Sequence, residues 1–192
     1  ALIGTALANP RAGKHVITTR IEHASVHEPF GRLEQMEYET QYLPVDQNGH
    51  VLPEVLEAAV REDTLLVSVM MVNNEMGALE DIKKLSAIAK KKNPNVIFHV
   101  DAIQGFGKVV LHPKRLGIDM LSVSGHKIHG PKGVGFLYVN EKIKIQPMIL
   151  GGGQQKGMRS GTDNVPGIAG LGTAAKLAME NMAKRAEKEK EL

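Results

Sequence analysis

Two short runs of the sequence, Thr64–Val72 and Val96–Val100, are almost entirely apolar and constrain the fold more than any other feature. They do not alternate between apolar and polar residues, so they are unlike strands that keep one face in water. Strands covered on both faces have this composition, and they belong to mostly parallel sheets with helices on either side. The two runs therefore predict a layered α/β fold.

Further strands and helices are expected to alternate along the chain around these two runs. Strands are predicted where apolar or β-branched residues lie between turn signals, at His15–Thr19, Thr64–Val72, Val96–Asp101, Met120–Ser124 and Gly135–Val139. Helices are predicted from helical spacing and capping signals at Ala1–Asn9, Pro53–Glu62, Ile82–Lys91 and Gly167–Lys190. The sequence thus predicts that residues 1–192 form one domain, a three-layer α/β structure with a mostly parallel central sheet.

The composition narrows the classes of function. The net charge is +3, aromatic residues make up 4%, and the densest basic run, Lys90–Lys92, lies at a predicted helix end, so a nucleic-acid surface is not expected. No apolar run approaches the roughly 20 residues that cross a bilayer, and no signal peptide is visible, so a cytoplasmic protein without a membrane partner is expected. The chain has no cysteine, which rules out disulfides and thiolate metal sites within it.

Polar residues follow four of the predicted strands. Ligands of open α/β sheets bind beyond the carboxyl ends of the strands, where these residues gather. In chain order they are Glu22-His23, Asn73-Asn74-Glu75, Asp101 with Gln104 nearby, and Gly125-His126-Lys127. The sequence therefore predicts an imidazole, an amide, a carboxylate and a lysine at one edge of the sheet.

A lysine, a carboxylate and an imidazole at one site are the parts of a pyridoxal phosphate enzyme. The lysine holds the cofactor aldehyde as a Schiff base, and the carboxylate keeps the pyridine nitrogen protonated. An imidazole stacked on the ring can move protons near neutral pH. Three glycines after the lysine are expected to let the backbone approach a ligand closely: Gly130, Gly133 and Gly135.

Five motifs in fixed order resemble the large domain of a cysteine desulfurase, in the class V, fold-type I aminotransferase superfamily. The resemblance extends over nearly the whole chain, and it is specific because the motifs occur together. They are Glu22-His23, Asn73 to Gly77, His99 to Gln104, Ser124 to Gly133, and Gly151 to Gln155 followed by Arg159-Ser160-Gly161-Thr162.

The resemblance implies a role for each residue around the cofactor ring. Lys127 is expected to carry the Schiff base, and His23 to stack on the ring and assist proton transfer. Asp101 is expected to pair with the pyridinium nitrogen. Asn74 and Gln104 are expected to hydrogen-bond the phenolic oxygen.

The resemblance also implies contacts with the cofactor phosphate and with other proteins. Ser124 and His126 are expected to bind the phosphate, and Thr162 to reach the phosphate of the partner subunit in a homodimer. The implied substrate is L-cysteine, which becomes L-alanine while the sulfur passes to an enzyme cysteine. Sulfur-acceptor proteins or iron–sulfur scaffold proteins are the implied partners.

Three parts of the family pattern have no counterpart in the sequence. They are a phosphate loop before the helix at Ala1, a small C-terminal domain after Leu192 with a substrate-binding arginine, and the sulfur-accepting cysteine. We therefore expect 1–192 to be a large-domain fragment, truncated at both ends, with little or no turnover alone.

Other interpretations remain open. A selenocysteine lyase or another class V aminotransferase would use the same cofactor, and a non-catalytic scaffold would keep only the fold and the dimer surface. Histidine pairs at metal-like spacing, His23 with His27 and His126 with His129, lack a third ligand, so no metal is expected. His15, His50 and His112 are predicted to be solvated or in turns, and Asp119 to be a structural residue at a strand entry.

Overall fold

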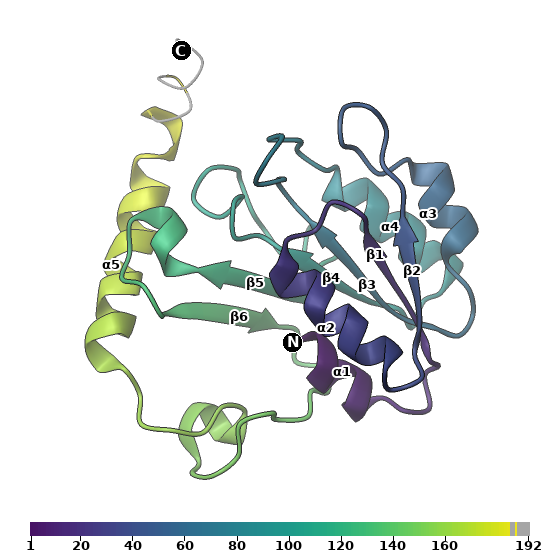
Figure 1. Cartoon of the computed structure of the whole chain (residues 1–192). Helices are drawn as coiled ribbons and strands as arrows, with labels where there is room; N and C mark the ends of the chain where they lie inside the picture. Colours follow the sequence, from purple (N-terminus) through teal and green to yellow (C-terminus); the bar gives the residue numbers. More distant parts are fainter. Residues whose placement is uncertain (185–186, 188–192) are drawn as a thin grey trace.

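The chain forms a six-stranded mixed sheet with strand order β2-β1-β3-β4-β5-β6 (Figure 1). The computed structural model describes residues 1–184 and 187. The strands are β1 (His15–Thr19), β2 (Glu39–Leu43), β3 (Thr64–Met70), β4 (Ile97–Asp101), β5 (Met120–Ser124) and β6 (Gly135–Val139). All neighbouring pairs are parallel except β5 and β6, so the predicted mostly parallel sheet is confirmed.

Helices cover both faces of the sheet and give the predicted three layers. The helices are α1 (Leu2–Ala8), α2 (Ala24–Glu34), α3 (Pro53–Ala59), α4 (Ile82–Lys92) and α5 (Val165–Glu180). One core cluster joins α3 and α4 to the sheet, and a second joins α1 and α2 to the opposite face (Figure 1). Phe98 is fully buried in the first cluster and Phe30 in the second.

Local sequence explains where the helices begin and end. Asp81 caps α4 by accepting a hydrogen bond from the Lys84 amide at 3.0 Å, and Lys90–Lys92 occupy its last turn, as expected. Pro53 begins α3, where its missing amide hydrogen costs nothing. The part of the predicted helix Gly167–Lys190 that falls on residues 185–186 and 188–190 lies outside the described residues.

The sequence prediction did not include β2 and α2. In β2 the residues alternate between more and less exposed, as an edge strand does, so no continuous apolar run marks it. α2 carries apolar Val26, Phe30 and Leu33 on one buried face, but Pro29 and Gly31 interrupt the pattern. The helix α2 matters for the site, because it begins directly after His23.

Two predictions about single residues have opposite outcomes. The prediction that His15 is solvated or in a turn is wrong, because His15 is fully buried in β1, with its Nδ1 2.8 Å from the Thr64 hydroxyl. Asp119 has the predicted structural role at the entry to β5. Its Oδ2 accepts the Phe98 amide hydrogen bond at 2.9 Å and pairs with Lys90 at 2.8 Å, which ties β4 and α4 to the start of β5.

Candidate functional site

The carboxyl ends of β1, β3, β4 and β5 meet at one edge of the sheet, because these strands are parallel. Asp101, the last residue of β4, is in register with Met70 of β3 on one side and Ser122 of β5 on the other. The polar residues that follow the strands therefore share one edge, as the sequence predicts.

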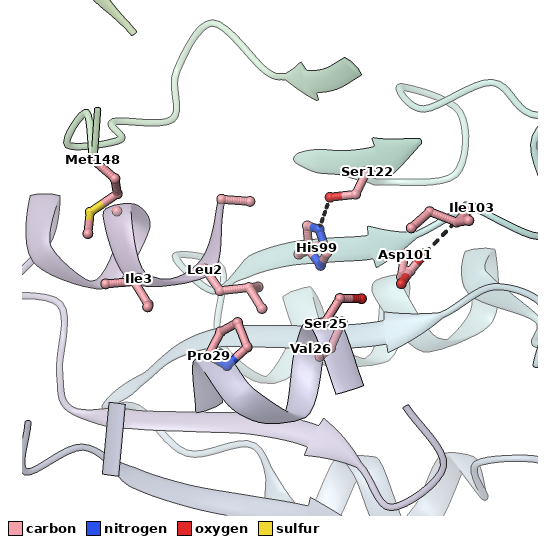
Figure 2. A pocket seen from close by; sticks show the side chains of 12 residues that line it. Leu2, Ile3, Ser25, Val26, Pro29, His99, Asp101, Ile103, Ser122 and Met148 are labelled. Carbon is pink, nitrogen blue, oxygen red and sulfur yellow. Dashed lines mark hydrogen bonds between the residues drawn. The ribbon is translucent and has the colours of Figure 1, made fainter. Parts of the chain in front are cut away.

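A pocket of about 290 Å³ opens at this edge, between the sheet and the first turns of α1 and α2 (Figure 2). Asp101 lines it, together with His99 and Ser122 from the neighbouring positions of the sheet. The remaining lining residues are Ala1, Leu2, Ile3, Gly4, Ser25, Val26, Pro29, Ile103 and Met148. Asp101 is the one member of the predicted site among these lining residues.

Asp101 is a carboxylate that burial has deprived of water. Its side chain is 2% exposed, and its Oδ1 accepts a hydrogen bond from the Ile103 amide at 2.9 Å. Burial raises the pKa of Asp101, while the Ile103 hydrogen bond and the charge of His23 act in the opposite direction. A cationic or N–H donor group in the pocket would stabilise the ionised form of this side chain and lower its pKa.

His23 caps α2 with its imidazole. Its Nδ1 accepts a hydrogen bond from the Ser25 amide at 3.1 Å and lies 2.8 Å from the Ser25 hydroxyl. Because Nδ1 accepts from a backbone amide, the proton of the neutral ring is on Nε2. His23 is exposed, and its partner Ser25 lines the pocket, so Nε2 is the ring atom that is free to exchange protons with a ligand.

Lys127 is exposed in a short 3₁₀ helix, η1 (Gly125–Ile128), directly after β5. Ile128 of the same turn is buried against Leu171, Ala174 and Ala178 of α5. His129 then adopts a left-handed conformation with φ 64°, and the chain turns back to β6. Lys127 is therefore exposed to solvent on a turn that packs against α5.

Ser124 and His126 lie together beside this lysine. The Ser124 hydroxyl is 2.8 Å from His126 Nδ1. Ser124 ends β5 and His126 lies in η1, directly before Lys127, where the family resemblance implies a phosphate contact.

The glycines around Lys127 serve packing within the protein. A Cβ at Gly130 would lie 2.9 Å from the Gly125 carbonyl oxygen, and one at Gly135 would collide with the Val123 carbonyl oxygen. The close approach that the sequence predicts at these two positions is therefore to the protein's own backbone. Gly133 has a φ of +74° and open space around it, which is typical of a turn.

Two predicted site residues make their hydrogen bonds elsewhere, and a third is exposed in a separate segment. The Asn74 amide donates to the neighbouring Glu75 carboxylate at 2.7 Å, and the Gln104 carbonyl accepts from Lys108 at 3.1 Å. Thr162 is exposed in the segment before α5. The structure places Asn74 and Gln104 after β3 and β4, at the edge that carries Asp101, but no contact brings them to the pocket.

Sequence reasoning assigned no role to two buried polar residues close to the pocket. Glu22 is 7% exposed, and its Oε1 accepts hydrogen bonds from the Met70 amide at 2.7 Å and the Thr19 hydroxyl at 2.9 Å, while its Oε2 has no partner among the described residues. Burial raises the pKa of Glu22 to about 8. His99 lines the pocket. The sequence signal that could have identified it is its position two residues before Asp101, which places both side chains on the same face of the strand.

The residues that the structure describes also bear on metal binding and membrane insertion. They contain no group of three or more side chains that could hold a metal ion. None of their helices has both the length and the apolar composition that crossing a membrane requires.

The chain matches the sequence profile of the Aminotransferase class-V family over residues 1–192. It is 47% identical to Cysteine desulfurase IscS of Clostridium botulinum strain Hall, over 98% of this chain and 47% of that protein. A solved structure described as a NifS-like protein superposes with a TM-score of 0.93 at 43% identity, covering 96% of this chain and 50% of the other. A second, described as SspA in complex with cysteine, has a TM-score of 0.84 at 38% identity, covering 91% and 52%. The chain thus spans about half the length of the relatives it matches.

Proposed function

Because the chain belongs to the aminotransferase class-V family, we propose that it forms the cofactor-binding part of a pyridoxal phosphate-dependent cysteine desulfurase. The observation that carries the proposal is the buried Asp101 carboxylate, which faces a pocket beside a histidine and a lysine at the same sheet edge. The names of the similar proteins support the substrate: one is called a cysteine desulfurase, and another is described in complex with cysteine.

The buried acid of the pocket, Asp101, fits the ring nitrogen of pyridoxal phosphate. Within the residues that the structure describes, no ion pair joins Asp101 to a cation; a protonated pyridine nitrogen would be such a partner and would lower the raised pKa of this carboxyl. The volume of about 290 Å³ is near the lower end of small-molecule sites. When bound, the cofactor supplies an aldehyde that bonds to an amine and a ring that accepts electrons from the substrate carbon.

Each residue at the sheet edge has a separate task in this proposal. Lys127 would provide the amine for the cofactor aldehyde, and the exposed turn that carries it leaves the amine accessible. Asp101 would hold the ring nitrogen by an ionic hydrogen bond. His23 would stack on the ring and move a proton at Nε2, since its Nδ1 is held by the Ser25 amide.

The remaining residues would orient the cofactor. Ser124 and His126 form a hydrogen-bonded pair at the end of β5 that would bind the phosphate. Asn74 and Gln104 would have to exchange their present partners, Glu75 and Lys108, for the phenolic oxygen of the ring. Thr162 would contact the phosphate bound to a second copy of the chain.

The proposed partners follow from the same activity. L-cysteine is the substrate, and sulfur-acceptor or iron–sulfur scaffold proteins receive the product sulfur. A cytoplasmic homodimer is the proposed assembly, and α5 supports it with four exposed large apolar side chains: Val165, Ile168, Leu177 and Met179. Because the chain contains no cysteine, it cannot itself carry the sulfur as a persulfide.

The cofactor assignment is tested by trapping. The purified chain is mixed with pyridoxal phosphate, reduced with borohydride, digested and analysed by mass spectrometry. We expect the pyridoxyl label on Lys127, and we expect Lys127→Ala to abolish both the label and the visible absorption of the bound cofactor. Lys132→Ala is the matched control, because Lys132 is exposed in the turn that follows and has no proposed contact.

Three results would overturn parts of the proposal. A label spread evenly over exposed lysines, or none at all, would leave a scaffold domain as the better interpretation. Release of alanine from cysteine by the 192-residue chain alone, at an ordinary enzyme rate, would contradict the need for a cysteine outside it. Faster conversion of selenocysteine than of cysteine would favour a selenocysteine lyase.

A further inference from the structure

His99 bridges three neighbouring strands under the pocket. Its Nδ1 lies 2.8 Å from the Ser68 hydroxyl of β3, and its Nε2 lies 2.8 Å from the Ser122 hydroxyl of β5. The imidazole is 2% exposed, and Ser68 is fully buried. Both ring nitrogens therefore have partners, and the ring orientation is fixed from both sides.

This bridge belongs to the pocket. His99, Ser122 and Asp101 all line it, and Figure 2 shows His99 bonded to Ser122 in the wall beside Asp101. His99 and Asp101 are two residues apart on β4, so their side chains project from the same face of the sheet. Ser122 is in register with Asp101 on β5. Any movement of the imidazole would displace the strand position opposite the carboxylate.

The imidazole in this bridge is neutral. Burial lowers the pKa of His99 to about 3, so the ring carries no charge near neutral pH. A neutral ring has one N–H donor and one acceptor, and each serine hydroxyl can take either role. The bridge thus gives the buried polar atoms hydrogen-bond partners, and it places no cation beside Asp101 in addition to the proposed pyridinium nitrogen.

We propose that His99 is a positioning residue of the cofactor site, which acts through Ser122 and the β4–β5 spacing to hold Asp101 against the ring nitrogen. The inference rests on the proposed function, because it assigns His99 a task toward the same cofactor. His99 does not touch the reacting atoms. It fixes the position of Ser122 and of the paired strands beside the Asp101 carboxylate, and it adds no charge there.

Two substitutions separate positioning from folding. His99→Leu removes both hydrogen bonds and leaves two buried hydroxyls without partners, whereas His99→Gln keeps one donor and one acceptor. The readouts are the dissociation constant for pyridoxal phosphate, the absorption maximum of the bound cofactor, and the urea midpoint of unfolding. Ser122→Ala, alone and combined with His99→Leu, tests whether the two residues act as a unit.

We expect His99→Leu to weaken cofactor binding by about tenfold and to shift the absorption maximum, because losing both hydrogen bonds lets the strand position beside Asp101 move and weakens the Asp101 contact by about the worth of one hydrogen bond. His99→Gln is expected to restore both readouts to near the wild-type values. Adding Ser122→Ala to His99→Leu is expected to weaken binding little further, because the wall has already lost its support.

The outcomes distinguish this inference from the proposed function. If the wild-type chain is labelled at Lys127 but His99→Leu binds the cofactor with unchanged affinity and spectrum, the positioning role alone is refuted. It is also refuted if both variants weaken binding only in proportion to their loss of stability. If the wild-type chain takes no label, the proposed function fails, and the role of His99 fails with it.

Discussion

Glu22→Gln should stabilise the protein increasingly as the pH rises. In the native chain this carboxyl is buried between the ends of β1 and β3, where one oxygen accepts two hydrogen bonds and the other has no partner. The amide oxygen of glutamine can accept the same two hydrogen bonds from Met70 and Thr19. Glutamine cannot ionise, so the substitution removes the titration and keeps the shape.

The size of the effect follows from the displaced pKa. Burial raises the pKa of Glu22 from 4.5 to about 8, so the folded chain holds this proton more tightly than the unfolded chain. The stabilisation is complete below pH 4.5 and is lost as the pH rises to about 8. A difference of about 3.5 pKa units, at about 1.4 kcal/mol each, gives an upper limit of about 5 kcal/mol.

The assay is urea unfolding followed by circular dichroism at several pH values between about 5 and 9. We expect the free energy of unfolding of Glu22→Gln, minus that of the wild type, to rise by at least about 2 kcal/mol over this range. The rise is smaller than the upper limit because the effective dielectric constant of the protein reduces the cost of burying the charge. Glu57→Gln on the exposed surface of α3 is the control, and its difference should stay level. If the difference in unfolding free energy between Glu22→Gln and the wild type also stays constant with pH, Glu22 is not a buried acid with a raised pKa.

Three further substitutions test the site and the core. Asp101→Asn removes the charge that faces the pocket and should weaken pyridoxal phosphate binding at least about tenfold in a fluorescence titration, since a charged hydrogen bond is lost; unchanged affinity would exclude an ionic contact. Asp119→Ala leaves the Phe98 amide and Lys90 without their acceptor and should cost about 1–3 kcal/mol of unfolding free energy in urea; a neutral result would mean that water replaces the carboxylate. Phe98→Ala empties the centre of the larger core cluster and should cost about 3–5 kcal/mol, far more than Phe136→Ala at the 38% exposed position on β6; equal costs would contradict the burial of Phe98.

The fold was predictable where burial on both faces leaves a continuous apolar run. The strands β1, β5 and β6 match their predicted bounds, and β3 ends two residues early because Val72 leaves the sheet to bridge with Leu79. The edge strand β2 was missed because its residues alternate in exposure. Apolar periodicity was present in α2, but a proline and a glycine within the helix concealed it.

The site was predictable as a set of strand ends and less so as a set of contacts. Parallel strands bring their carboxyl ends together, so the shared edge of His23, Asp101 and Lys127 follows from the order of the elements. The hydrogen bonds that occupy Asn74 depend on local turn geometry, which spacing does not encode. His99 resembles an ordinary core residue until β3, β4 and β5 pair and supply its two hydroxyl partners.

The order of the strands has a consequence for how the chain is assembled during synthesis. After β1 and β2 pair, each later strand joins the opposite, growing edge of the sheet in the order in which the ribosome releases it: β3, β4, β5 and then β6. No strand has to be inserted between two that are already paired, so the layers can form while translation continues. Asp101 and His99 become enclosed when β5 docks on β4, whereas the turn with Lys127 gains its support only after α5 has been made. The carboxylate side of the proposed site is therefore complete before the lysine side, and a chain stalled before α5 would hold half of the proposed cofactor site.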